Sequence, residues 1–377
     1  MISILKKTVF FALLIISNIV FSQNLPLSEK AKVSVITCDT GNESYSLFGH
    51  TAIRITDIDN NLDVVYNYGA FDFATPNFVA KFAKGDLQYF AIAHSFQDFL
   101  NQYTFEQRTV FEQELLISRA YKQKLFDNLN AVLASEKKYY TYKFIDKNCT
   151  SMVVDILNQT LGSKIIFKKT DTDKTYRSIL YPYFDNSFYE KLGTSIIFGK
   201  KVDELGTRIF LPLELHKNLA TTQFGNQLLS KKSETLLEFK KETSKSWWNT
   251  IYTLIAFLAI VVILNKRSVD LFYLTLMGVF GIFFVFMGFY SFHLELEYNY
   301  NILLFNPFLL LLIYFYARQN RKWIINSGYL NVFLVLIYVV FMLNKIHLLI
   351  VLPFVLTNII LLTRIIIKNS KRIPVII

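Results

Sequence analysis

The final third of the chain, from about residue 247 onward, is apolar enough to lie in a lipid bilayer, and this constrains the fold more than any other feature. Over its 377 residues the protein is 53% hydrophobic and 18% charged, whereas soluble proteins carry about 25% charged residues. A transmembrane helix needs roughly 20 apolar residues, and five segments approach that length: 247–264, 271–292, 302–317, 324–343 and 347–367. We therefore expect a mixed-composition front domain followed by a five-helix transmembrane domain over 247–367.

Lysine and arginine residues in the short loops predict the orientation of these spans, because cytoplasmic loops are enriched in both. With the front domain outside, the outward loops contain only Lys345, and the cations gather in the cytoplasmic loops and tail: Lys266, Arg267, Arg318, Arg321, Lys322, Arg364, Lys368, Lys371 and Arg372. The tail, residues 368–377, is thus expected in the cytoplasm. Because many cations flank apolar spans and no nucleic-acid-binding motif accompanies them, the net charge of +11 does not indicate a nucleic-acid partner.

Residues 1–22 have the pattern of a secretory signal peptide, in which Lys6 and Lys7 precede an apolar run and the small Ser22 stands before Gln23. A short membrane anchor is the alternative, and either one delivers the following section across the membrane. No cysteine follows the expected cleavage site, so we do not expect the protein itself to be a lipoprotein. The signal and the loop charges agree on an exported front domain.

The connection between the two sections, residues 229–246, contains KKSETLLEFKKETSK and predicts a basic, amphipathic juxtamembrane helix. This helix would serve either as a solvated spacer or as a contact to anionic lipids. Trp247 and Trp248 come next, at the start of the first span, where amphipathic rings suit the level of the lipid headgroups.

The front domain alternates between strand-like and helix-like patterns, which predicts an α+β fold. KVSVITC, TAIRITDI and LDVVYNYG are rich in β-branched residues, and DIDNN between the last two predicts a hairpin. Helical periodicity runs through residues 105–135. A second helix is expected in CTSMVVDILNQTLG, with Met152, Val153, Ile156 and Leu157 on one face and Gly162 as its stop signal.

Cys149 and His50 are the residues most suited to chemistry. Cys149 stands where the second helix should start, and the positive end of a helix dipole with its unpaired N–H groups favours a thiolate. His50 begins a strand and is a candidate general base, which is normally oriented by a third group. If the hairpin turns at DIDNN, the returning strand passes His50 near Asn67 or Tyr66, so either is a candidate for that group.

The remaining cysteine and histidines suit structural roles better. Cys38 lies inside a strand pattern and is expected to be a packed core thiol, although a disulfide with Cys149 is an alternative in an oxidising compartment. His94 and His216 are expected to be structural. The sequence has no HExxH, CxxC, Walker or GxSxG motif, so we expect neither a metal nor another cofactor.

The second outward loop, FHLELEYNYNILLFNP, is unusually polar for its place between two spans. Polar residues near membrane depth are costly and often functional, although a merely solvated loop is the simpler interpretation. We expect it to line the approach to the active site, together with Tyr45 in the segment before His50; its candidate substrate-binding residues are His293, Glu297, Asn299 and Asn301.

Four segments together resemble a known family. ITCDTGNESYSLFGHTAIRI, VVYNYGAFDF, YKFIDKNCTSMVVDIL and HLELEYNYNILLFNP are similar to the Lnb-type lipoprotein N-acyltransferases of Bacteroidetes, which join an exported domain to a membrane section. A histidine strand before a cysteine helix also resembles the permuted papain-like thiol hydrolases and acyltransferases. Two departures stand out: Asp39-Thr40-Gly41 replaces a Pro-Gly turn expected after Cys38, and Ser151 replaces a threonine. The first leaves the local turn open.

The resemblance implies a permuted papain-like catalytic domain at residues 23–228, placed in the periplasm and attached to the bacterial inner membrane. It implies Cys149 as the nucleophile, His50 as the base, a membrane phospholipid as the acyl donor and a diacylated lipoprotein as the acceptor. The acyl chain would pass through a cysteine thioester to the amine of the lipoprotein's N-terminal cysteine. A membrane-anchored cysteine peptidase or amidase acting on cell-wall peptides, and a non-catalytic scaffold, are the alternatives.

Overall fold

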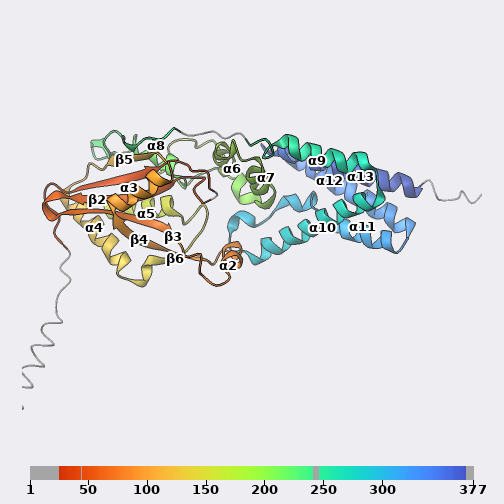
Figure 1. Ribbon diagram of the computed structural model, residues 1–377, viewed down its shortest axis with the longest axis horizontal. Helices are drawn as coiled ribbons and strands as arrows, with labels where there is room; N and C mark the ends of the chain where they lie inside the picture. The colour runs from red at the N-terminus through yellow and green to blue at the C-terminus, as the bar shows by residue number, and fades with distance from the viewer. Residues whose placement is uncertain (1–24, 44, 241–245, 371–377) are drawn as a thin grey trace, which may run out of the picture.

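The computed structural model describes residues 25–43, 45–240 and 246–370. The predicted signal peptide and residues 371–377 of the predicted tail lie outside this part. A sheet-rich α+β domain occupies one end of the elongated molecule, and apolar helices occupy the other (Figure 1). The expected division into a mixed-composition front domain and an apolar helical section is therefore confirmed.

The front domain is built on one seven-stranded antiparallel sheet with the order β6-β4-β3-β2-β1-β5-β9. Its strands are β1 (Lys32–Cys38), β2 (His50–Asp57), β3 (Leu62–Ala70), β4 (Gln88–Ser95), β5 (Val110–Glu114), β6 (Tyr139–Thr141) and β9 (Glu234–Leu237). The predicted hairpin is confirmed, because β2 and β3 pair in a register that sets Ala52 opposite Asn67. The start of β2 and the end of β3 therefore meet at the same end of the sheet.

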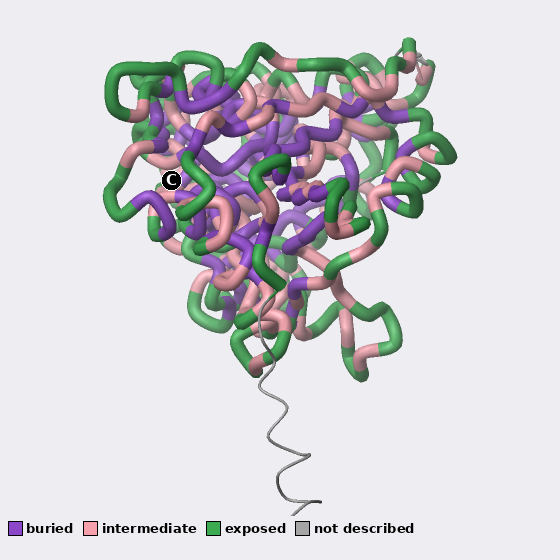
Figure 2. Tube along the Cα trace, turned by 90° about the vertical axis from the view of Figure 1, so that its left-hand side faces the viewer, coloured by how far each residue is buried: buried purple, intermediate pink, exposed green. Residues whose placement is uncertain are grey.

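Three helices cover the two faces of the sheet: α3 (Phe96–Phe105), α4 (Arg119–Leu133) and α5 (Cys149–Leu161). Side chains alternate between the faces of a strand, so Val35 and Ile53 pack in the core with α4 and α5, while Ile36 and Ala52 pack against Phe99 of α3. Buried segments accordingly run through the middle of the molecule when it is viewed from this end, with exposed segments around them (Figure 2). The confirmed helix α5 is held at the sheet by this packing.

Two predicted helices are wrong in part. The expected helix over 105–135 is divided into β5 and α4, because residues 110–114 pair with both β1 and β9. The expected juxtamembrane helix is also wrong over its described part, where β9 adds an edge strand to β5 and Lys231 pairs with Glu114 at 2.8 Å. In both segments, hydrogen bonds to a distant strand outweigh the local helical periodicity.

The apolar section contains the helices α9 (Ile251–Leu264), α10 (Arg267–Tyr290), α11 (Phe308–Ala317), α12 (Arg321–Met342) and α13 (Leu348–Ser370). Among the described residues, α10, α12 and α13 are long and apolar enough to cross a membrane. A fourth span is possible if residues 294–303 and α11, which meet at a bend of 42°, act together. The prediction of five spans is not confirmed, because the 14 residues of α9 extend only about 21 Å.

A buried ion pair ties three of the apolar helices together. Arg364 of α13 contacts Asp270 of α10 at 3.0 Å and donates a hydrogen bond of 2.7 Å to the carbonyl of Val262 in α9. Charged groups at membrane depth are expensive unless they are paired. This pairing explains how Asp270, which is 2% exposed, is accommodated inside the bundle.

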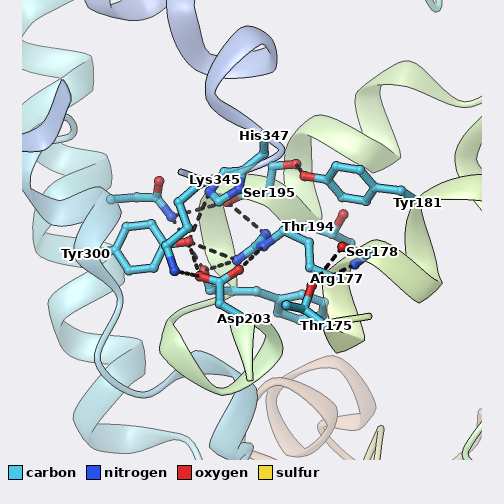
Figure 3. Close-up of polar contacts among 12 residues, drawn as sticks. Thr175, Arg177, Ser178, Tyr181, Thr194, Ser195, Asp203, Tyr300, Lys345 and His347 are labelled. Atoms are coloured by element: carbon cyan, nitrogen blue, oxygen red, sulfur yellow. Dashed lines mark hydrogen bonds and ion pairs between the residues drawn. The ribbon is translucent and has the colours of Figure 1, made fainter. Parts of the chain in front are cut away.

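A polar cluster, which we call the joint, connects the front domain to the apolar helices (Figure 3). Arg177 of α6 (Tyr176–Leu180) contacts Asp203 at 2.7 Å and the Tyr300 hydroxyl at 3.2 Å. The Tyr300 hydroxyl donates to Asp203 at 2.6 Å, and Lys345, before α13, lies 3.3 Å from the same carboxylate. Because Arg177 and Asp203 precede the apolar section while Tyr300 and Lys345 belong to it, the joint fixes the two parts relative to each other.

Candidate active site

Cys149 is the first residue of α5, and the start of this helix is fixed by side-chain hydrogen bonds. The side-chain oxygen Oδ1 of Asn148 accepts from the Ser151 N–H at 2.9 Å, and the Ser151 hydroxyl accepts from the Asn148 N–H at 2.9 Å. Asn148 also donates to the carbonyls of Phe144 and Phe210 at 2.7 and 2.9 Å. This reciprocal capping box holds the thiol at the positive end of the helix dipole. Ser151, which stands where the resemblance led us to expect a threonine, supplies the hydroxyl that the capping box needs.

His50 and Asn67 stand beside the thiol on neighbouring strands. The distance from His50 Nε2 to Asn67 Oδ1 is 3.0 Å, and the Asn67 amide nitrogen donates to the Val65 carbonyl. Because that second bond assigns Oδ1 as the acceptor, Nε2 of His50 carries the proton, which leaves Nδ1 for the thiol. The structure thus brings together Cys149, His50 and Asn67.

The electrostatics of the pair favour the charged forms of both groups. Burial alone would raise the pKa of the Cys149 thiol, but the charge and hydrogen bond of His50 outweigh it and place that pKa below its usual value. Burial likewise opposes the charged imidazole, yet the Cys149 charge and the hydrogen bonds to Cys149 and Asn67 raise the pKa of His50. A thiolate beside an imidazolium is the reactive state of a cysteine nucleophile.

Two features that the sequence did not predict lie beside this thiol. Gly69 sits where the pairing of β3 with β4 is irregular, with φ at +102°, and a Cβ added there would approach the Cys149 Cβ to 3.7 Å. The Thr150 hydroxyl lies 3.9 Å from Sγ and 3.0 Å from the Thr51 hydroxyl. The sequence did contain signals for both features: Gly69 precedes aromatic-rich segments, and Thr51 and Thr150 directly follow His50 and Cys149.

Tyr140 is a further residue that sequence reasoning missed. It lies in β6, is 4% exposed, and its hydroxyl has no hydrogen-bond partner in the part of the chain that the structure describes. Burial raises the pKa of Tyr140, and the nearby charge of Cys149 raises it further. A buried, unpartnered hydroxyl close to a thiolate is a donor available to a bound substrate.

Comparison with known proteins agrees with this geometry. Residues 26–181 match the family model described as the Lnb N-terminal periplasmic domain, and this range contains Cys149, His50, Asn67 and Tyr140. The front domain is an Lnb N-terminal periplasmic domain. No curated protein and no solved structure matches the chain. Together with the apolar helices, the match supports a membrane protein whose N-terminal domain is periplasmic.

Cys38, the other cysteine, and Tyr66, the alternative orienting group, lie elsewhere in the Lnb domain. Cys38 is buried opposite His50 in the sheet, and burial raises the pKa of its thiol far above the usual value. Both cysteines are free, so the structure does not contain the alternative disulfide. Tyr66 donates to Asn130 at 2.9 Å and packs in the core that lies beneath α4 and α5, away from Asn67 and His50.

His94 and His216 take no part in the contacts of Cys149. His216 Nε2 lies 2.8 Å from the Ser233 hydroxyl and its ring packs 5.2 Å from that of Phe111. His94 is half-buried on β4, and burial lowers its pKa. Across the described residues, no three His, Cys, Asp or Glu side chains gather as they would around a metal ion.

The predicted substrate-binding residues of the second outward loop lie in the connection between the Lnb domain and the apolar helices. Asn299 and Asn301 donate to the carbonyls at the end of α7 (Phe188–Ile197), with Asn299 Nδ2 2.9 Å from the Ile196 oxygen. His293 Nε2 lies 2.9 Å from the Phe82 carbonyl, while Glu297 is half-buried. These contacts give the loop a connecting role, because the last carbonyls of a helix need donors.

Tyr45 is 64% exposed in the segment between β1 and β2. The structure therefore does not gather the five predicted substrate-binding residues at Cys149. Their contact with substrate stays a prediction.

Proposed function

We propose that this protein is a lipoprotein N-acyltransferase that works through an acyl-thioester on Cys149. The observation that carries the proposal is the Cys149–His50–Asn67 arrangement at a helix start, inside an Lnb periplasmic domain that is attached to membrane-spanning helices. A cysteine nucleophile, an adjacent base and a group that orients the base are the parts that covalent acyl transfer requires.

In the first half-reaction the Cys149 thiolate attacks the ester carbonyl of a phospholipid acyl chain. The tetrahedral intermediate collapses when the bond to the glycerol oxygen breaks, and the imidazolium of His50 gives its proton to that oxygen. The products are a lysophospholipid and an acyl-thioester on Cys149. Asn67 holds the imidazole in the orientation that this proton transfer needs, through the 3.0 Å contact to Nε2.

In the second half-reaction the α-amine of a diacylated lipoprotein's N-terminal cysteine attacks the thioester. His50, now neutral, takes a proton from the amine, the carbon–sulfur bond breaks, and the thiolate is regenerated. The product is an amide, so the lipoprotein leaves with a third acyl chain. Holding two lipid-anchored substrates at one bilayer surface favours this step over attack by water.

Both half-reactions place negative charge on the carbonyl oxygen, which preorganised donors stabilise. The backbone N–H of Cys149, at the start of α5, is one such donor. The Tyr140 hydroxyl, buried and without a partner among the described residues, is proposed as the second. This assignment gives a role to a polar group that would otherwise cost free energy by lying unpaired in the core.

The proposed membrane is the bacterial inner membrane, with the C-terminus in the cytoplasm. Lys345 lies near the Lnb domain through Asp203. At the opposite end of the bundle, the start of α10 meets the end of α13, where Lys368 donates to Asn265 at 3.1 Å. Among the loops that join the apolar helices, the cations lie at that end and only Lys345 lies at the domain end, which agrees with the positive-inside rule.

Mass spectrometry of a lipoprotein N-terminus tests this proposal. In cells that depend on this protein, Cys149→Ala should leave lipoproteins diacylated, whereas the matched variant Cys38→Ser should leave them triacylated because Cys38 is a buried core thiol. Triacylated lipoproteins in the Cys149→Ala cells would refute the proposed activity.

A further inference from the structure

A short segment between β3 and β4, residues 71–84, leads from the active site toward the apolar helices. It ends in the helix α2 (Phe78–Lys84) and follows directly on Gly69 and Ala70, at the end of β3 beside Cys149. We call residues 71–84 the bridging segment. In Figure 1, α2 lies between the sheet and the end of α10.

Contacts to the last three backbone carbonyls of α2 fix this helix at the end of a membrane-spanning helix. α10 ends at Tyr290, and the Ser291 hydroxyl donates to the Ala83 carbonyl at 2.8 Å. The Phe292 N–H donates to the Lys84 carbonyl at 2.7 Å, and His293 Nε2 lies 2.9 Å from the Phe82 carbonyl. Because α10 crosses the bilayer, these bonds place α2 at the boundary between the hydrocarbon core of the bilayer and the lipid headgroups.

The bridging segment exposes large apolar side chains at this depth. Phe73 is 71% exposed, Val79 76% and Phe82 45%. The neighbouring end of α10 continues the surface with Phe289, which is 90% exposed, and Phe292, which is 56% exposed. Such a patch is unfavourable in water but favourable at a bilayer interface, where aromatic rings are enriched.

Lysines lie next to this patch, and Lys84 among them pairs with Asp86 at 2.6 Å, so Lys81 is the one that suits an anionic headgroup. Lys81 and Lys84 lie in the last turn of α2. The Lys84 amine is 5.4 Å from the ring centre of Phe292 and 6.0 Å from that of Tyr290, so its stem covers apolar surface while its charge stays at the edge. Cations beside exposed apolar residues are the pattern of an interfacial membrane contact.

A chain of aromatic rings joins the exposed patch to the thiol. The ring of Phe73 lies 4.8 Å from that of Phe71, which lies 5.1 Å from Tyr89. Tyr89 is then 4.5 Å from Tyr142 and 6.3 Å from Tyr140, the residue beside Cys149. We call these rings the aromatic wall; it runs without a break from the exposed Phe73 to Tyr89 and Tyr140, which are 7% and 4% exposed in the core.

We propose that the bridging segment is embedded in the outer leaflet of the membrane and guides a phospholipid acyl chain from the bilayer along the aromatic wall to Cys149. The embedding rests on the contacts with α10 alone, whereas the guiding role rests on the proposed acyl transfer. The two parts therefore have separate tests.

The embedding is tested by the depth of a fluorescent label in the full-length protein, reconstituted in phosphatidylcholine and phosphatidylglycerol vesicles. Both cysteines are first replaced by serine, and then Val79→Cys or Ile58→Cys receives an environment-sensitive fluorophore. Ile58 is a matched control, because it is also 76% exposed but lies at the opposite end of the sheet, between β2 and β3. Nitroxide-labelled lipids should quench the label at position 79 several-fold more than the label at position 58. Equal, weak quenching at both positions would overturn the embedding.

The guiding role is tested by Phe73→Ser combined with Val79→Ser and Phe82→Ser, with Ile58→Ser as the control. Acyl transfer from bilayer phospholipid should fall at least tenfold in the triple variant, while alkylation of Cys149 by water-soluble iodoacetamide should keep its rate and so report an intact site. Unchanged acyl transfer, or equal loss of both reactions, would overturn the guiding role. If Cys149→Ala cells keep triacylated lipoproteins, the proposed activity fails, but the label at position 79 still decides the embedding.

Discussion

The joint and the active site are both buried polar clusters, and they differ in how many of their central polar groups have hydrogen-bond partners. In the joint, Arg177 donates to Asp203, Tyr300 and the carbonyls of Ser195 and Phe198, so the guanidinium is surrounded by acceptors. In the active site, Cys149 is half-buried and the Tyr140 hydroxyl has no partner among the described residues. The comparison teaches that the guanidinium of the joint, saturated by acceptors, indicates assembly, whereas the thiol–imidazole pair with its shifted pKa values indicates chemistry.

The largest expected effect is the loss of acyl transfer when the nucleophile of the active site is removed. Cys149→Ala should lower acyl transfer by roughly 10⁴-fold or more, because a covalent mechanism loses its nucleophile. Its thermal unfolding should stay close to that of the parent, since the thiol is half-buried and lies at the first turn of α5. Transfer within tenfold of the parent would place the chemistry elsewhere.

A substitution in the joint should lower stability rather than remove the nucleophile. Arg177→Met leaves the Asp203 carboxylate buried with fewer partners, so the free energy of unfolding should fall by about 3–5 kcal/mol. Arg208→Met is the control, because Arg208 makes an exposed ion pair with Asp155 at 2.9 Å, which is worth about 1 kcal/mol or less. Denaturant unfolding of the full chain in detergent measures both. Equal losses would show that the joint is no more than a surface contact.

Substitutions of the groups around the thiol should lower acyl transfer less when the group does not itself transfer a proton. His50→Ala removes the base and should lower transfer by about 10²–10⁴-fold. Asn67→Ala only frees the imidazole to rotate, so we expect a smaller loss, on the order of tenfold. Single-turnover rates of thioester formation measure the two variants side by side. A loss for Asn67→Ala as large as that for His50→Ala would mean that Asn67 does more than orient the imidazole.

The pH dependence of Cys149 alkylation tests whether the charge of His50 lowers the pKa of the thiol. The pKa of Cys149 is lowered and that of His50 is raised, so alkylation should persist at pH values below the ordinary pKa of a thiol. In His50→Gln the opposing charge is gone and burial prevails, so the alkylation profile should move to higher pH. An unmoved profile would show that the helix start alone lowers the thiol pKa.

The smallest expected effect concerns the helix cap. Ser151→Ala removes the hydroxyl that accepts from the Asn148 N–H at 2.9 Å and should cost about 1 kcal/mol of stability. Ser151→Thr keeps that acceptor and should unfold like the parent. Calorimetric or fluorescence-monitored unfolding distinguishes them, and identical midpoints for both variants would remove Ser151 from the cap.

Much of the site could be predicted because its signals are local. The alternating pattern at His50, the turn at residues 57–61 and the helix start at Cys149 each lie within a few residues of the feature they predict. The hairpin geometry led to two candidates for the orienting group, Asn67 and Tyr66, and the structure places Asn67 at His50. Tyr140 could not be found this way, because it lies on a three-residue edge strand whose place depends on β4, far from it in sequence.

The errors share one physical cause. β5 and β9 read as parts of helices, but each is held by hydrogen bonds to strands distant in the chain. The polar loop after α10 remains a predicted substrate-binding loop, and the structure adds a connecting role, because its Asn299 and Asn301 donate to carbonyls about 100 residues earlier. Long-range pairing of backbone groups leaves no periodic trace in the sequence.

The most direct test of the central claim is the mass of the full-length protein after incubation with bilayer phospholipid and no acceptor. The proposed mechanism predicts one added acyl chain on Cys149, released by hydroxylamine and discharged by a diacylated lipopeptide that gains the same mass. A protein that stays unmodified, or that carries an acyl chain the lipopeptide cannot remove, would contradict it.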